Sequence, residues 1–248
     1  MGCSQTSDYP VHVPGSGDLM HERPDAGGRV RCEFDAIARL PETGRWDHNA
    51  LYHPFLLRHL PGRIGQALEV GCGTGTFARA LADRAERVVA LDFAPEMIAV
   101  AREQYSDRAN LEFILADALE WDYPAGEFDC VASIATLHHL PFPEMLARFE
   151  HALRPGGVLL VVDLVSDAGV FDLLLNAAAL PVNLAMRLLH TGHLRESAEV
   201  RVAWDEHGAG ERYLTLPEVR SVAQRVIPGA RIRRHLMWRY SLIWRKMG

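Results

Sequence analysis

The chain has 248 residues, of which 48% are hydrophobic and 23% charged, and its formal net charge at pH 7 is −6. This length can bury a sizeable core, so we expect one main globular domain. The negative charge disfavours a nucleic-acid partner, because phosphate binding depends on clustered lysine and arginine. The basic end of the chain, residues 231–246, alternates arginine with apolar residues and is predicted to be an exposed strand pair instead.

The first segment, residues 1–32, is rich in Pro, Gly, Ser and Asp and lacks hydrophobic periodicity, which predicts a disordered tail. Its start, Met1-Gly2-Cys3, fits an acylation pattern. Lys246 is the one lysine among 26 basic residues, however, which indicates a GC-rich, bacterial genome where that pattern is a coincidence. Without an apolar leader or spanning stretch, we expect a cytoplasmic protein with no stable membrane insertion.

The four cysteines lack a paired Cys-x-x-Cys spacing, so we expect reduced thiols and no structural metal. They are Cys3, Cys32, Cys72 and Cys130.

Residues 33–63 are predicted to form N-terminal helices near the open end of a sheet. The helical pattern breaks at residues 41–45 and resumes with Trp46. Tyr52 and His53 are candidates for orienting a substrate, because the spacing places Tyr52 on a face that should turn inward. Ordinary helix packing accounts for the presence of Trp46 and Tyr52 in this segment about as well as a role at a binding site does.

Residues 64–163 alternate apolar runs with helical segments. The predicted strands are 66–70, 87–91, 111–115, 128–133 and 157–163, and the predicted helices are 76–86, 95–104 and 143–153. Each alternation implies a right-handed crossover and hence a parallel sheet. Residues 216–248 should add a helix and an antiparallel strand pair at 231–237 and 240–245. The fold class is therefore α/β, with a doubly wound, mostly parallel, seven-stranded sheet.

A glycine-rich turn follows the first predicted strand. Residues 67–76 read ALEVGCGTGT, with Gly71, Gly73 and Gly75 on alternate positions. Glycines tolerate positive φ and let a ligand lie against bare backbone, which indicates a cofactor site. Asp92 ends the next apolar run, as expected of an acid that binds the ribose hydroxyls of an adenosine. The nicotinamide fingerprint has a glycine where this chain has Thr76, so dinucleotide binding is the lesser alternative.

Two later segments complete an ordered set of motifs: LEFILADALEW at 111–121 and LRPGGVLLVVD at 153–163. Over residues 64–165 the chain resembles the class I S-adenosylmethionine-dependent methyltransferases, most nearly the small-molecule branch that includes the quinone and sterol methyltransferases. The resemblance implies S-adenosyl-L-methionine as cofactor and a small molecule as methyl acceptor.

The resemblance also implies roles for single residues. Glu69 would face the ammonium of the methionine moiety. Asp92 would bind the ribose, with Phe93 against the adenine face. Asp117 and the Ala118 amide would bind the adenine edge. The other implied cofactor contacts are Gly71, Cys72, Gly73, Met97, Ser133 and Ile134.

The alternative that Glu69, Asp92 and Asp117 are merely solvated loop acids stays open, although all three end apolar runs. Because Asp92 is read as an exposed acid, Asp92→Ala should abolish cofactor binding and leave the fold largely intact.

Methyl transfer from a sulfonium requires mainly orientation of the acceptor, which can supply ~7–11 kcal/mol. His138 and His139 are candidate general bases, because imidazole titrates near neutral pH. The family often carries this pair as part of its fold pattern, which is the alternative. An Asn-Pro-Pro-Tyr type of motif is absent here, which disfavours nucleobase amines and glutamine amides as acceptors.

Residues 164–215 form an insertion that the minimal fold does not need. Residues 170–190 are apolar but interrupted, which predicts a kinked pair of buried helices rather than a membrane span. We interpret the insertion as a lid over the acceptor, which favours an apolar or aromatic acceptor. A role in covering the core or forming a homodimer is nearly as well supported. The residues expected to line the acceptor pocket are Phe171, Leu175, Leu180 and Met186.

Two other functions remain open from the sequence. One is a non-catalytic S-adenosylmethionine-binding protein, a sensor or partner subunit, which would need the same acids. The other is a nicotinamide-dependent reductase, against which Thr76 and the Asp117 segment count.

Overall fold

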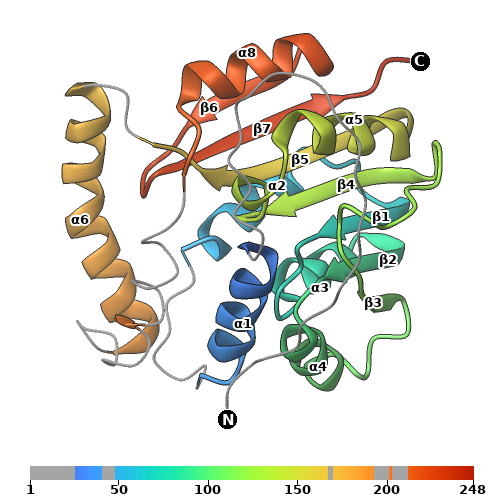
Figure 1. Ribbon diagram of the computed structural model, residues 1–248, viewed down its shortest axis with the longest axis horizontal. Coiled ribbons are helices and arrows are strands. Elements are labelled where there is room, and N and C mark those ends of the chain that lie inside the picture. Colours follow the sequence, from blue (N-terminus) through green and yellow to red (C-terminus); the bar gives the residue numbers. More distant parts are fainter. Residues whose placement is uncertain (1–25, 41–47, 167–169, 193–200, 203–211) are drawn as a thin grey trace.

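The computed structural model describes residues 26–40, 48–166, 170–192, 201–202 and 212–248. Its strands are β1 (Ile64–Val70), β2 (Ala85–Asp92), β3 (Leu111–Leu115), β4 (Phe128–Ile134), β5 (Leu153–Leu164), β6 (Arg231–Arg234) and β7 (Arg239–Arg245). They form one seven-stranded sheet in the order β3-β2-β1-β4-β5-β7-β6 (Figure 1). Strands β1 to β5 pair in parallel, and β7 runs antiparallel to both β5 and β6. The predicted fold class is confirmed.

Helices cover both faces of the sheet. The helices α3 (Thr76–Ala82) and α4 (Pro95–Gln104) pack into the core on one face, and α5 (Phe142–Ala152) and α8 (Leu216–Val226) pack on the other. Every residue of β4 is buried, as expected for a central strand of a parallel sheet covered on both sides. This arrangement places the carboxyl ends of the parallel strands together at one edge, where ligands of open α/β sheets bind.

The first helix, α1 (Ala26–Ala38), begins before the predicted boundary at residue 33. The expectation of a disordered tail is therefore wrong for residues 26–32, and residues 1–25 lie outside the described part of the chain. Gly27 and Gly28 weaken the helical pattern in the sequence. Burial overrides that weakness, because Val30 is buried and Ile37 packs with Ala94 and Met97 beside α4.

The boundary between α3 and β2 also differs from the prediction. The sequence predicts a helix to residue 86, but α3 ends at Ala82 and β2 begins at Ala85. Alanine, arginine and glutamate favour a helix here by propensity. Pairing decides instead, because Ala85 lies opposite Ile64 in the parallel ladder with β1.

Two short elements precede the sheet: η1 (Ala50–Tyr52) and α2 (His53–Leu57). Trp46 lies outside the described residues. The predicted second N-terminal helix is thus shorter than expected, and its first turn is a 3-10 helix.

The insertion contains one long helix, α6 (Val170–Thr191), with Pro181 inside it. The predicted pair of buried helices is therefore wrong. Between residues 179 and 189 its apolar residues are mostly exposed, whereas Asn183 and Arg187 are partly buried. The exposed residues of this stretch are Leu180, Pro181, Val182, Leu184, Ala185, Leu188 and Leu189. Among the described residues, no helix is long and apolar enough to cross a membrane.

The turn from β6 to β7 has an unusual backbone. Met237 and Trp238 have φ values of 57° and 55°, in the left-handed region. A hairpin turn with two such residues normally uses Asn-Gly, because a side chain at positive φ costs roughly 1–2 kcal/mol per residue. Two hydrogen bonds to backbone carbonyls hold the turn in place. The Trp238 carbonyl accepts from the Val165 amide at 2.9 Å, and the Met237 carbonyl accepts from the Arg239 side chain, Nη1, at 2.7 Å.

Candidate active site

The glycine-rich turn leaves β1 with three left-handed residues, Gly71, Gly73 and Gly75. A β-carbon on Gly71 would overlap the side chain of Thr136, and one on Gly75 would lie 2.6 Å from the ring of Phe113. A β-carbon on Gly73 would meet no atom within 4 Å. The first and third glycines thus serve internal packing, and Gly73 is the one that leaves open space for a ligand.

Asp92 is the last residue of β2, and its side chain holds the glycine-rich turn by hydrogen bonds. Its Oδ2 accepts from the Gly73 amide at 2.8 Å, and its Oδ1 accepts from the Ala94 amide at 2.9 Å. The side chain is buried, contrary to the expectation of an exposed acid. Burial raises the pKa of Asp92, and the amide hydrogen bonds partly offset this. Replacing Asp92 would therefore loosen the glycine turn, contrary to the expectation that Asp92→Ala leaves the fold largely intact.

Glu69 lies in β1, adjacent to Asp92, with 2% of its surface exposed. Its Oε2 has no hydrogen-bond partner within the described part of the chain. Burial, reinforced by the charge of Asp92, raises the pKa of Glu69 well above its usual value. A buried carboxylate is costly unless a cation or donor meets it. Glu69 and Asp92 therefore fit a positively charged ligand such as a sulfonium with an amino group.

The third acid, Asp117, stands in the turn that follows β3. It is exposed, and its Oδ1 accepts from the Leu119 amide at 2.8 Å. The Ala116 amide donates to the Asp92 carbonyl at 2.9 Å, which places this turn directly beside the end of β2. Ala118 is half-buried in the same turn, with its carbonyl accepting from the Tyr123 hydroxyl. The three acids thus lie at the ends of three adjacent strands.

Several predicted cofactor contacts are also part of the packing around the site. Met97 is buried against Ile37 of α1. The Ser133 hydroxyl donates to the Val70 carbonyl at 3.0 Å and ties β4 to β1. Burial raises the pKa of the Cys72 thiol, which keeps it neutral. Ile134 is buried at the end of β4.

His138 forms the most distinctive polar contact at this edge of the sheet. It lies in η2 (Leu137–His139), and its Nδ1 is 2.6 Å from Oδ1 of Asp163 in β5. Both side chains are nearly inaccessible, with 5% and 2% exposed. The same Asp163 oxygen accepts from the Leu164 amide at 2.8 Å. A carboxylate can only accept, so Nδ1 of His138 is the donor in this contact.

Aromatic rings connect this pair with the cofactor side of the site. The rings of His138 and His139 are 3.9 Å apart, and His139 lies edge-to-face with Phe34 of α1 at 5.6 Å. Phe34 in turn meets Phe93, next to Asp92, at 6.3 Å. Tyr213 lies 5.2 Å from the His138 ring. Phe93 is therefore half-buried against α1, and α1 spans the site from the end of β2 to the histidine pair.

Tyr52 and His53 make packing contacts in the structure, and their role in orienting a substrate stays a prediction. Tyr52 is buried, and its hydroxyl donates to the Leu236 carbonyl at 2.8 Å. The ring of His53 packs against Phe77 of α3 at 4.8 Å. Tyr52 thus joins the N-terminal segment to the β6–β7 turn, which is a structural contact.

Sequence reasoning missed Asp163, Thr136, Phe34 and Tyr213. Asp163 had a signal, because it ends an apolar strand run as Asp92 does. Thr136 excludes a side chain at residue 71, and Tyr213 contacts His138. Both relations are between segments far apart in sequence, so no local sequence pattern predicts them.

Known proteins resemble the chain in sequence and in fold. The family described as "Methyltransferase domain" matches residues 67–157. An uncharacterised methyltransferase of Mycobacterium tuberculosis is 31% identical over 207 residues, covering 81% of this chain and 96% of the relative. The demethylmenaquinone methyltransferase of Thermus thermophilus is 34% identical over 141 residues, covering 54% of this chain and 62% of the relative.

Among solved structures, the N-methyltransferase NodS of Bradyrhizobium japonicum in complex with S-adenosyl-L-homocysteine has a TM-score of 0.60 at 17% identity, covering 88% of this chain and 98% of NodS. At that identity the likeness shows the fold alone. Together with the sequence matches, it means that the chain belongs to the class I S-adenosylmethionine-dependent methyltransferases. It is a methyltransferase with S-adenosyl-L-methionine as methyl donor, and the open space at Gly73 and the unpartnered oxygen of Glu69 fit that molecule.

Proposed function

We propose that the protein methylates a small, apolar or aromatic molecule whose acceptor atom carries an acidic proton. The observation that carries this proposal is the buried 2.6 Å hydrogen bond between His138 and Asp163 at the carboxyl edge of the sheet. A carboxylate that holds an imidazole in one tautomer and stabilises its protonated form is an arrangement that serves general-base catalysis.

The chain's own residues would divide the work as follows. Glu69 would meet the positive charge of the cofactor, Asp92 its ribose and the Asp117–Ala118 turn its adenine. Gly73 would leave room for it. The cofactor, when bound, supplies the methyl group as an electrophilic sulfonium. Nε2 of His138 would accept the proton of the acceptor atom, and Asp163 would stabilise the imidazolium that results.

The apolar character of the acceptor is supported by α6. Leu180 and Met186 of the predicted pocket lie in the described part of this helix, and Leu180 lines a slot at the β6–β7 turn. The side chains of Phe171 and Leu175 lie outside the described set. The exposed apolar residues of α6 equally suit a second copy of the chain, so the homodimer stays a prediction, as does the cytoplasmic location.

The test begins with acceptor discovery. Release of S-adenosylhomocysteine is measured for a panel of phenols, hydroquinones, amines and carboxylic acids. With the best acceptor, Asp163→Asn is compared with wild type across pH 5 to 9. The amide cannot stabilise an imidazolium, so we expect kcat to fall by about 10²–10⁴-fold, the usual contribution of general-base catalysis.

The control is His151→Gln, which changes an exposed histidine on α5 and should leave turnover unchanged. Cofactor affinity by calorimetry should stay within threefold of wild type in both variants. A wild-type kcat for Asp163→Asn would refute the general-base role. Release of no S-adenosylhomocysteine with any acceptor class would refute the proposed substrate range.

A further inference from the structure

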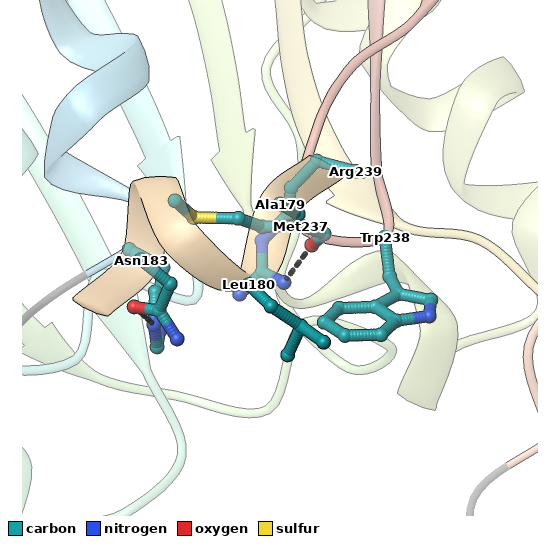
Figure 2. Close-up of a pocket in the computed structure, with 7 residues that line it drawn as sticks. Ala179, Leu180, Asn183, Met237, Trp238 and Arg239 are labelled. Carbon is teal, nitrogen blue, oxygen red and sulfur yellow. Dashed lines mark hydrogen bonds between the residues drawn. The ribbon is translucent and has the colours of Figure 1, made fainter. Parts of the chain in front are cut away.

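A small slot separates α6 from the β6–β7 turn. Its volume is about 80 Å³, and Figure 2 shows the Leu180 side chain pointing toward the indole of Trp238 at its mouth. These two side chains are 64% and 40% exposed. The residues that line the slot are His48, Ala179, Leu180, Asn183, Met237, Trp238 and Arg239.

The polar side chains of the slot are held by contacts within the protein. His48 Nε2 lies 2.8 Å from Asn183 Oδ1, which joins α6 to the N-terminal segment. Arg239 donates from Nε to Asn49 Oδ1 at 3.0 Å. The exposed walls are therefore apolar and aromatic. A cavity of about 150 Å³ takes up a benzene ring, so this slot admits a short alkyl group or the edge of a ring whose remainder lies on the indole.

Trp238 has a strained backbone conformation, and packing of its side chain does not explain why a tryptophan occupies this position. Its φ is 55°, and the preceding residue, Met237, is also left-handed. Met237 is 2% exposed and so contributes to the packing. Trp238 is attached through its backbone carbonyl, which accepts from Val165, while much of its indole is exposed. Strained residues of this kind persist at ligand clamps, where they form part of the binding surface.

The slot lies at the same edge of the sheet as the proposed general base. Val165, which holds the Trp238 carbonyl, is two residues beyond Asp163, the partner of His138. Arg239 lies opposite Leu164, and Tyr240 lies opposite Asp163, in the β5–β7 ladder. The slot and the His138–Asp163 pair thus lie at the same end of β5.

We propose that this slot binds the apolar end of the methyl acceptor, with Trp238 as a specificity-determining residue that stacks on a flat ring. The inference rests on the proposed function, because it assumes that the molecule in the slot is the acceptor. The ligand class is an aromatic molecule with a proton-bearing group at one end and no charge at the other. The geometry favours it because the indole is a planar, half-exposed surface beside an apolar recess.

The test uses 2-naphthol as the probe and the full-length protein labelled with ¹⁵N. Titration should shift the indole N–H signal of Trp238, which is assigned as the signal that disappears in Trp238→Phe. Trp238→Gly removes the ring and relieves the left-handed strain. We expect it to bind 2-naphthol at least tenfold more weakly than wild type, with a thermal midpoint equal to or above that of wild type. Trp238→Phe should retain affinity within about threefold.

The matched control is Leu189→Ala, which removes an apolar side chain that is 78% exposed on α6 and is not part of the slot lining. It should bind 2-naphthol as wild type does. Unchanged binding by Trp238→Gly, or a titration that leaves the Trp238 signal in place, would overturn the proposal.

Calorimetry with S-adenosylmethionine separates this inference from the proposed function. If the cofactor binds and an acceptor turns over while the Trp238 signal stays in place, the slot proposal alone is wrong. If 2-naphthol binds at Trp238 but no acceptor of the panel is methylated, the slot is a binding site and the proposed function fails.

Discussion

At the scale of single residues, the buried carboxylate of Glu69 is the group whose charge most directly favours binding of a positively charged ligand. Its raised pKa reflects burial first and the nearby charge of Asp92 second. The folded protein without cofactor therefore holds a proton on Glu69 more tightly than the unfolded chain does. The stability that this gives is fully present below the usual pKa of 4.5 and is lost as pH rises through the folded value.

Glu69→Gln should consequently raise the thermal midpoint of the cofactor-free protein, and the gain should grow as pH rises above 4.5. The same change should weaken S-adenosylmethionine binding by about tenfold or more, because hydrogen bonds to charged groups contribute ~1.5–3 kcal/mol. Glu112→Gln, on an exposed glutamate of β3, is the control for both effects. A variant that is less stable and binds the cofactor normally would contradict the role of Glu69.

For single residues, the sequence predicted where along the strands the acids lie better than it predicted whether their side chains are buried. The three strand-end acids fall where the sequence places them, because apolar runs that end in an acid mark the ends of parallel strands. The burial of Asp92 could not be predicted, since its two amide partners depend on how the glycine turn folds back over β2.

At the scale of elements, we expect Gly71 in the glycine turn to serve packing and Gly73 to serve cofactor binding. Gly71→Ala adds a β-carbon that collides with Thr136 at positive φ, so we expect a loss of roughly 2–5 kcal/mol in the free energy of unfolding. Gly73→Ala meets open space and should lose only about 1–2 kcal/mol from its left-handed backbone.

Cofactor affinity should fall more in Gly73→Ala than in Gly71→Ala, because the new methyl group at residue 73 occupies the space left for the ligand. Chemical denaturation and calorimetry on both variants measure the two quantities. If Gly71→Ala proved as stable as wild type, or if Gly73→Ala bound S-adenosylmethionine with unchanged affinity, this division of roles would be wrong.

Element boundaries show what the sequence can and cannot predict. The predicted bounds of α4 and β3 agree with the structure, because Pro95 marks the helix start and the apolar run of β3 is short and distinct. The early start of β2 and the single helix α6 were missed. Pairing with β1 decides the first. In the second, the helix continues through Pro181 where the sequence predicts a break.

At the scale of the whole molecule, the site draws on segments from along the chain. The parallel strands and the segments that directly follow them supply the acids and the histidine pair. Helix α1 covers them through Phe34, and α6 meets the β6–β7 turn (Figure 1). The sequence motifs lie in the part of the candidate site built from β1 to β5. The contributions of α1, α6 and the β6–β7 hairpin depend on packing between segments distant in sequence, so no sequence motif predicts them.

The central claim is that the ends of β1, β2 and β3 hold the cofactor with its sulfur directed toward His138. The most direct measurement is a crystal structure of the full chain with S-adenosyl-L-homocysteine. The account predicts ribose hydroxyls on Asp92, the amino group near Glu69, backbone contact at Gly73 and the sulfur facing the His138–Asp163 pair. A nucleoside bound elsewhere, or a sulfur turned away from that pair, would contradict it.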